Sequence, residues 1–281
     1  YSKRAESFSS MSLIPKSLRQ KLEKNFKLND FVQETVRRSS DGSVKILLTL
    51  QDGNSIETVF MPWLDSETGE TARNTLCVSS MAGCPLSCAF CATGALGFKR
   101  NLTASEIIGQ LFVSERICGE KITNLVFMGM GEPLLNYENV LSSIKKLTNK
   151  RHKLLSERKI TISTSGMLSR MYKLAGEKMK IKLALSLHGT TDAQRELIMS
   201  GASASGKLSE LLEAMEHYYR AVKIPLTYEY ILFDGVNDST KDAERLSKIS
   251  RRAPSSVNII PYNDISHTDA FRQSTIKLKP S

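Results

Sequence analysis

The pattern of apolar and polar positions separates a short first block of the chain from a longer, alternating one. In residues 12–27 a leucine or phenylalanine recurs at four-residue intervals, which predicts a short amphipathic helix. Two alternating runs, 44–50 and 55–61, flank an Asp-Gly turn and predict a β-hairpin. A block of about 60 residues is too small for a large core. We therefore expect residues 1–73 to form an accessory helix-plus-hairpin domain that ends in a polar linker.

From residue 75 onward, apolar runs of strand length alternate with amphipathic runs of helix length. Continuous apolar strands between amphipathic helices are typical of a parallel sheet covered by helices. We expect an α/β fold, a partial (βα)6 barrel over residues 74–270, and a tail at 271–281 that stops before a sixth helix. The six strands are predicted at 75–80, 123–129, 159–163, 181–187, 226–232 and 256–261, and the five helices at 104–117, 137–148, 167–176, 207–222 and 240–251.

Charge and hydropathy narrow the class of protein. The formal net charge of +10 favours a polyanionic partner such as RNA. Residues 145–159 hold seven Lys or Arg against one acid, and beside a barrel mouth such a run would contact RNA phosphates; Lys99 and Arg100 form a second candidate contact. No apolar stretch approaches the roughly 18 residues of a membrane span, so the sequence predicts no membrane association.

Cysteines are the main candidates for chemistry. Cys84, Cys88 and Cys91 form a C-x3-C-x2-C loop directly after the first barrel strand, where barrels of this type carry their reactive groups. An odd count of five cysteines, four of them between residues 77 and 91, argues against a disulfide framework and for a reducing compartment such as the cytoplasm, an organellar stroma or a matrix. Three adjacent thiolates need a positive centre. A closed zinc site wants a fourth ligand, and the nearest downstream histidine is His152, whereas a three-cysteine iron–sulfur cluster leaves one iron open.

The residues around this loop resemble a known family. Residues 77–111, CVSSMAGCPLSCAFCATGALGFKRNLTASEIIGQL, are similar to the cluster loop of the radical S-adenosylmethionine RNA methyltransferases that modify carbon 2 of adenine. They are also similar to the relatives that methylate carbon 8. The resemblance covers about residues 12–264 and continues in order through FMGMGEPLLNY, ITISTSG, LSLHG, LFDGVND and NIIPYN. It implies a radical S-adenosylmethionine barrel that methylates large-subunit ribosomal RNA, with transfer RNA left open as a second substrate.

The resemblance also implies the cofactors and the residues that bind them. It places a [4Fe-4S] cluster on Cys84, Cys88 and Cys91, with the open iron binding S-adenosylmethionine, whose cleavage gives a 5′-deoxyadenosyl radical. An electron donor such as flavodoxin or ferredoxin would reduce the cluster, and we expect the enzyme to be a monomer. Glycines at a strand end let a ligand approach the backbone, and a glutamate there can accept bonds from an ammonium group. The implied contacts to S-adenosylmethionine are Gly131, Glu132, Ser163, Ser186, Leu187, His188 and Asn263.

Two further residues match reactive positions of the family. Glu57 occupies the place of a proton acceptor, although an exposed glutamate is ordinary on a hairpin. Cys77 occupies the place of a cysteine that releases product through a transient disulfide, although a small buried residue is ordinary in a strand. Its partner in the family is a methyl-carrying cysteine in a run like DAACGQL, and no cysteine follows Cys118 here. We therefore expect a chain truncated at its carboxyl end. This departure leaves open a radical enzyme with another substrate, or an inactive RNA-binding fragment.

Overall fold

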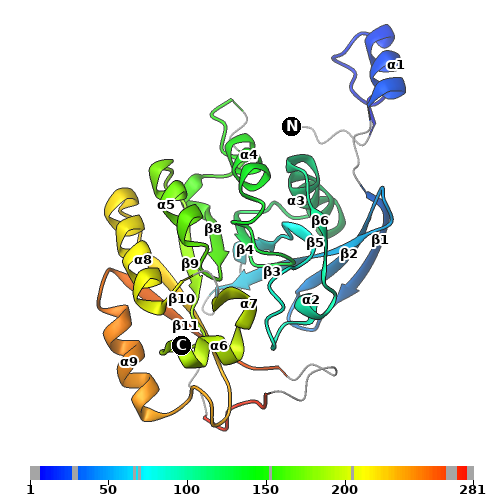
Figure 1. Cartoon of the computed structure of the whole chain (residues 1–281). Helices are drawn as coiled ribbons and strands as arrows, with labels where there is room; N and C mark the ends of the chain where they lie inside the picture. The colour runs from blue at the N-terminus through cyan, green and yellow to red at the C-terminus, as the bar shows by residue number, and fades with distance from the viewer. Residues whose placement is uncertain are drawn as a thin grey trace.

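The computed structural model describes residues 7–26, 31–65, 68, 71–151, 154–203, 206–263 and 271–276. Nine strands form one sheet in the order β1-β2-β3-β4-β7-β8-β9-β10-β11, and β5 and β6 form a separate pair (Figure 1). The strands are β1 (Phe31–Arg38), β2 (Val44–Leu50), β3 (Ser55–Leu64), β4 (Thr71–Cys77), β5 (Met81–Gly83), β6 (Phe98–Asn101), β7 (Asn124–Phe127), β8 (Ile160–Thr164), β9 (Lys182–Ser186), β10 (Leu226–Leu232) and β11 (Ser255–Pro261). The helices are α1 (Lys16–Asn25), α2 (Ala92–Ala95), α3 (Ala104–Cys118), α4 (Tyr137–Leu147), the 3-10 turn η1 (Glu157–Lys159), α5 (Leu168–Gly176), α6 (Asp192–Ile198), α7 (Ser200–Ser203), α8 (Leu208–Val222) and α9 (Thr240–Ser250).

The expected barrel is present. Strands β4, β7, β8, β9, β10 and β11 pair in parallel, and α3, α4, α5, α8 and α9 connect them in the predicted order. The helices are delimited by local signals: α3 begins with a reciprocal Thr103–Glu106 capping box and ends at Gly119 in the left-handed conformation. Five short elements, β5, α2, β6, α6 and α7, lie in segments for which the periodicity predicted nothing. Those runs are too short for a periodic signal.

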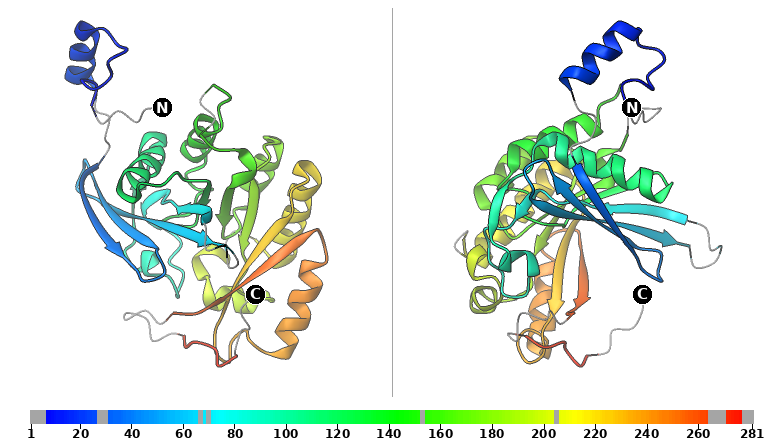
Figure 2. Two further views of the ribbon diagram at one scale, coloured as in Figure 1. Left: turned by 180° about the vertical axis from the view of Figure 1, so that it is seen from behind. Right: turned by 90° about the vertical axis from the view of Figure 1, so that its right-hand side faces the viewer.

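The first block of the chain continues the barrel sheet. The hairpin β2–β3 forms as predicted and pairs antiparallel around Asp52 and Gly53, where Gly53 has φ +83°. Strand β1, which the periodicity did not predict, pairs with β2, and β3 pairs antiparallel with β4. Strand β4 begins at Thr71, so the last residues of the expected linker are strand. Helix α1 buries no residue and stands apart from the sheet in every view (Figure 2).

Register divides the sheet into two faces. Leu76, Leu125 and Phe127 point to one face and belong to a core shared with apolar residues of the covering helices. On the other face, Cys77 is aligned with Val126 of β7, and both are only half-buried. This second face is where the barrel strands carry their polar side chains. Within the described residues no helix is long and apolar enough to cross a membrane.

Candidate active site

The predicted site residues meet at one edge because the barrel strands are parallel. The cysteine loop follows β4, Gly131 and Glu132 follow β7, and Ser163 lies near the end of β8. Ser186 ends β9, with Leu187 and His188 directly after it, and Asn263 follows β11 as an exposed residue. Carboxyl ends of parallel strands share an edge, which in barrels of this kind carries the reactive loops.

Close backbone contacts hold the cysteine loop in place. The Cys84 N–H donates to the Gly97 carbonyl at 3.2 Å, and a Cβ on Gly83 would lie 1.8 Å from that same oxygen. On the other side, a Cβ on Gly201 of α7 would lie 2.0 Å from the Leu86 carbonyl oxygen. Glycine is therefore required at both contacts, since any side chain would displace the loop.

The electrostatics of the loop fit a cationic cluster. Cys84, Cys88 and Cys91 are free and half-buried. Burial raises the pKa of Cys88 to about 12 and raises that of Cys84, and the neighbouring cysteines raise both further. As bare thiols Cys84 and Cys88 stay protonated, so a bound cation must supply the compensation that makes them thiolates.

The arrangement of the cysteines indicates whether that cation is a single metal ion or a cluster. Among the described residues, no three His, Cys, Asp or Glu side chains are arranged to hold a single metal ion. In a [4Fe-4S] cluster each cysteine binds a different iron, so its ligands do not converge as the ligands of one ion do. Three thiols with no fourth protein ligand are the donor set of such a cluster with one open iron.

Glu132 is a buried carboxylate at the mouth of the barrel. Its residue is 3% exposed, and burial raises the pKa of its carboxyl. The Leu134 N–H donates to Oε1 at 3.0 Å, and the N–H and hydroxyl of Ser165 both donate to Oε2 at 2.8 Å. Gly131 has φ +97°, and a Cβ there would lie 2.5 Å from the Cβ of Met81. The turn thus needs glycine, and it presents an oriented acceptor for an ammonium group.

Hydroxyl groups of two strands meet beside this carboxylate. The Oγ atoms of Ser163 and Ser186 lie 3.2 Å apart, within hydrogen-bond distance. Leu187 is fully buried, and its N–H and carbonyl already bond to the Glu229 carbonyl and to Arg195, at 2.9 and 2.7 Å. The two serine hydroxyls are therefore the groups here that can bond to a ribose-like ligand.

His188 is held in an unusual backbone conformation. Its φ is +49°, and its ring lies edge-on to Phe90 of the cysteine loop with centroids 5.0 Å apart. Nδ1 accepts the Ile231 N–H at 3.2 Å, which leaves the ring proton on Nε2. Burial lowers the pKa of His188 to about 3, so the imidazole is neutral at physiological pH.

Glu57 and Cys77 share the polar face of the sheet. Val59 of β3 lies directly opposite Cys77 of β4, so these side chains point to the same face, and Glu57 points there too because it is two residues from Val59. The Glu57 carboxylate pairs with Lys45 at 3.3 Å and is 44% exposed. Burial raises the pKa of the Cys77 thiol to about 11, so the thiol is protonated at neutral pH.

Four polar residues near the site were not among the residues predicted from the sequence. Ser165 and Arg195 bond to the strand-end loops, and Glu229 and Asn258 form a pair on the polar face, where the Asn258 amide donates to Glu229 at 2.7 Å. The periodicity of apolar positions predicts strands and helices, but it does not distinguish a functional polar residue from any other polar residue. Ser165 lies within the motif ITISTSG and Asn258 begins NIIPYN, so these motifs could have drawn attention to both residues. The importance of Arg195 and Glu229 comes from tertiary contacts.

The basic run 145–159 lies away from this edge. The run 145–159 connects α4 to β8, so it lies at the opposite edge of the sheet from the cysteine loop (Figure 1). The expectation that it flanks the barrel mouth is wrong, because a helix-to-strand connection returns the chain to the amino end of the next strand. Residues 152 and 153 of this run lie outside the described residues. Arg100 forms ion pairs with Asp52 and Glu106, the latter at 2.8 Å, so its guanidinium is already engaged.

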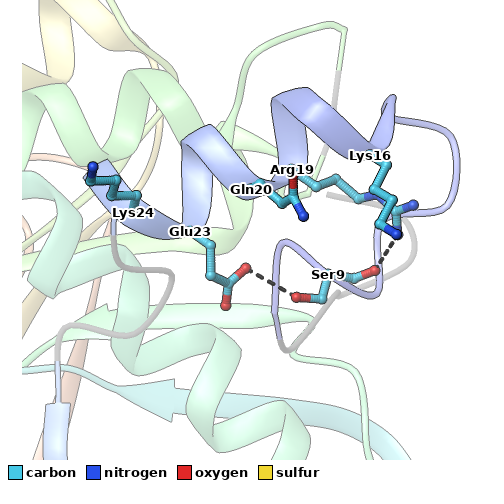
Figure 3. A pocket seen from close by; sticks show the side chains of 6 residues that line it. All are labelled: Ser9, Lys16, Arg19, Gln20, Glu23 and Lys24. Atoms are coloured by element: carbon cyan, nitrogen blue, oxygen red, sulfur yellow. Dashed lines mark hydrogen bonds between the residues drawn. The ribbon is translucent and has the colours of Figure 1, made fainter.

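A hollow near the amino terminus carries no catalytic groups. It lies between α1 and the loop before it (Figure 3). Ser9 donates to Glu23 across it at 3.3 Å. None of its lining residues is among those at the strand ends, so it is separate from the candidate site. Those lining residues are Ser9, Lys16, Arg19, Gln20, Glu23 and Lys24.

Comparison with known proteins gives consistent matches. The model of the Radical SAM superfamily matches residues 78–246. A protein of Akkermansia muciniphila named probable dual-specificity RNA methyltransferase RlmN is 43% identical over 264 residues, which are 94% of this chain and 73% of that protein. A protein of the same name from Thermus thermophilus is 43% identical over 266 residues, with the same two coverages. The crystal structure of a radical SAM methyltransferase from Sphaerobacter thermophilus is similar at a TM-score of 0.90 and 35% identity, covering 98% of this chain and 80% of that one.

Proposed function

This chain belongs to the radical S-adenosylmethionine RNA methyltransferases, enzymes that use a [4Fe-4S] cluster and S-adenosylmethionine, and we propose that it methylates carbon 2 of adenine. Its substrate is large-subunit ribosomal RNA, with transfer RNA as a second substrate. The relatives at 43% identity carry the name dual-specificity RNA methyltransferase, which supports an RNA substrate. A low-potential protein such as flavodoxin or ferredoxin supplies the electron, and the enzyme works as a monomer in the cytoplasm.

One observation carries the proposal: a thiol and a carboxylate share the polar face of the sheet beside the cysteine loop. Cys77 and Glu57 lie on neighbouring strands on that face, and β4 leads directly into the loop of Cys84, Cys88 and Cys91. This arrangement supports Glu57 as a proton acceptor and Cys77 as a nucleophilic sulfur, because both lie near the strand ends that would bind the cofactors. An RNA base held there would have S-adenosylmethionine, Glu57 and Cys77 on the same side.

Each residue has a role that its surroundings support. Cys84, Cys88 and Cys91 hold the cluster, which when bound supplies the electron that cleaves S-adenosylmethionine. Glu132 orients the amino group of S-adenosylmethionine, because its two oxygens are already fixed by Leu134 and Ser165. The remaining contacts to this cofactor come from Gly131, Ser163, Ser186, Leu187, His188 and Asn263.

Glu57 and Cys77 act on the RNA base. Glu57 takes the proton that leaves carbon 2, and its exposure to solvent lets that proton pass onward. Cys77 releases the product after losing its proton: its thiolate attacks the sulfur of the methyl-carrying cysteine of the DAACGQL-like run. The bond between that sulfur and the transferred carbon breaks, and the electron pair stays on the carbon, which takes up a proton as a disulfide forms. The raised pKa of Cys77 keeps the thiol protonated and unreactive until RNA is bound.

The first experiment reads the cofactor chemistry alone. Residues 1–281 contain no cysteine after Cys118 to carry a methyl group, so cleavage of S-adenosylmethionine to 5′-deoxyadenosine is the readout for this polypeptide. After anaerobic reconstitution we expect about four iron per chain and slow cleavage. Replacing Cys84, Cys88 or Cys91 by Ala should abolish both, whereas Cys118→Ala should retain both. Stoichiometric zinc without iron would contradict the assignment.

The second experiment reads the RNA product. A carboxyl-terminal segment with a DAACGQL-like run is added, and RNA nucleosides are analysed by mass spectrometry. We expect 2-methyladenosine, and Glu57→Gln should reduce it by roughly 10²- to 10⁴-fold while cleavage of S-adenosylmethionine continues. Glu34→Gln, which removes another ion-paired carboxylate, is the matched control. Formation of 8-methyladenosine, or full activity of Glu57→Gln, would refute the proposal.

A further inference from the structure

Arg195 of α6 is a buried cation bonded to the strand-end loops. The residue is 2% exposed. Nη1 donates to the carbonyls of Ser186 and Leu187 at 2.9 and 2.7 Å, and Nη2 donates to the carbonyl of Ser165 at 2.8 Å. One guanidinium thus joins the loops after β8 and β9, and a planar fork of donors is suited to such a set of acceptors.

The charge of Arg195 has no close counter-ion in the protein. In the part of the chain that the structure describes, its guanidinium forms no ion pair with a carboxylate, and Asp192 on the same helix attracts it only from a distance. Burial lowers the pKa of Arg195 to about 10, so it stays protonated at neutral pH. A buried, uncompensated charge is costly. Such a site is expected to face an anion that the folded chain itself does not supply.

The cysteine loop is packed against the helix that carries Arg195. The Ala89 N–H donates to the Ile198 carbonyl at 3.1 Å, and Cys88, Ala89 and Phe90 pack against a cluster that includes Ile198 and Met199. This contact brings Cys88 within electrostatic reach of Arg195.

The other charged and titratable groups around Arg195 are accounted for. His188 is neutral, as described above. Glu132 is connected to Arg195 through Ser165, whose N–H and hydroxyl donate to Glu132 while its carbonyl accepts from Arg195. Glu132 is assigned to the amino group of S-adenosylmethionine. Three acidic residues line an open hollow beside Arg195: Asp192, Glu196 and Glu210. Among the described residues none of these forms an ion pair with it, so the cysteine loop is the buried source of negative charge.

We propose that Arg195 is a positioning residue that provides the fixed positive charge beside the iron–sulfur cluster and holds the cofactor-binding loops against it. This inference rests on the proposed function. Three thiolates around a 2+ cluster core leave a net charge of −1, and one electron from a low-potential donor protein makes it −2. A nearby cation in a region of low dielectric stabilises the more negative state. Arg195 therefore raises the midpoint potential of the cluster, so that a larger fraction of it is in the reduced state that cleaves S-adenosylmethionine.

The test compares charge with hydrogen bonding. Arg195→Gln removes the charge, Arg195→Lys keeps it without the fork, and Arg245→Gln is a matched control whose guanidinium pairs with Asp242 and Thr190 instead. Iron and sulfide content and the midpoint potential, followed by electron paramagnetic resonance, are measured on reconstituted full chains. We expect a more negative midpoint potential for Arg195→Gln and potentials close to wild type for Arg195→Lys and Arg245→Gln.

A fully loaded Arg195→Gln with the wild-type potential would overturn the inference. If Arg195→Gln binds no iron, Arg195→Lys decides: normal loading and potential support the charge, whereas an iron-free Arg195→Lys shows that the hydrogen bonds alone matter and overturns it. RNA methylation is not read in these measurements. If the expected shift is found but the extended enzyme of the second experiment methylates no RNA, the proposed function is refuted and the role of Arg195 stands.

Discussion

The hydroxyl of Ser79 donates to the backbone carbonyl of Glu57 at 2.6 Å. The same Oγ accepts the N–H of Met130 at 3.0 Å, so one side chain connects β3 to the loop after β7. Gln110 of α3 fixes Ser79 in turn, because its amide group bonds to both the N–H and the carbonyl of Ser79, at 2.8 and 2.9 Å. The strand that carries the candidate proton acceptor is thereby held in place by the first residues after β4.

Replacing Ser79 by Ala tests this connection. Two buried hydrogen bonds disappear and the Met130 N–H loses its acceptor, so we expect the free energy of unfolding to fall by about 2 kcal/mol. Urea denaturation measures the change. Ser209→Ala, at an exposed position of α8, should change it by less than about 0.5 kcal/mol. Equal effects of the two substitutions would show that the Ser79 bonds contribute no net stability.

Gly201→Ala tests the contact between α7 and the cysteine loop. Its new Cβ would lie 2.0 Å from the Leu86 carbonyl oxygen, so the loop must shift, at a cost of about 1–3 kcal/mol. We expect reduced iron loading after reconstitution, measured by iron analysis. Gly176→Ala is the control, since a Cβ on Gly176 meets no atom within 4 Å. Full loading of Gly201→Ala would mean that the loop adjusts without disturbing the cysteines.

His188 should make stability depend on pH. Its pKa is lowered by burial to about 3 in the folded chain, against about 6.5 when unfolded, so the unfolded state binds more protons between these values. The free energy of unfolding is therefore not reduced by His188 above pH 6.5. As pH falls from 6.5 toward 3, it decreases by up to about 1.4 kcal/mol per pH unit.

The matched variant is His188→Asn, because asparagine tolerates the left-handed backbone at φ +49°. Urea midpoints measured from pH 7 to 4 should fall less steeply in this variant than in the wild type. His217→Asn, at an exposed position of α8, should leave the slope unchanged. Parallel profiles for wild type and His188→Asn would rule out this contribution.

Glu229 should lower the free energy of unfolding as pH rises, which is opposite to the effect of His188. Burial raises the pKa of its carboxyl, so the folded state favours the protonated form, and ionisation above that pKa costs stability. Glu229→Gln keeps an oxygen acceptor for Asn258 and cannot ionise. We expect it to be more stable than the wild type at pH 8, with a difference that shrinks as pH falls toward 4. Glu213→Gln, exposed on α8, should show no such trend in urea unfolding.

Much of the fold followed from local pattern. Alternating apolar and amphipathic runs predicted the six barrel strands and five helices, because each run is long enough to show its own period. The C-x3-C-x2-C spacing and the glycine-rich turn at Gly131 were also readable, because each motif is local. A parallel arrangement then brings strand ends to one edge whatever the side chains are, so Glu132, Ser163 and His188 could be placed together from the order of elements alone.

Tertiary structure decided what depends on register and on contacts between distant segments. The alignment of Val59 with Cys77 fixes that Glu57 and Cys77 share a face, and a shift of one residue would separate them. The closure of β3 onto β4 extends the barrel sheet into the first block. The position of residues 145–159 at the edge away from the cysteines was misjudged, since charge says nothing about which end of a strand a loop adjoins.

The sequence alone therefore determined the type of fold, the C-x3-C-x2-C loop and the family, because each of these depends on the local order and spacing of residues. Only the folded chain revealed Arg195 beside the cysteine loop and Ser79 beneath Glu57. Both act through carbonyl groups of residues in other elements or loops, 8 to 30 positions away in sequence, at hydrogen-bond distances of 2.6 to 2.9 Å. Backbone carbonyls are present at every residue, so no residue type in the sequence marks the partners that such side chains will find.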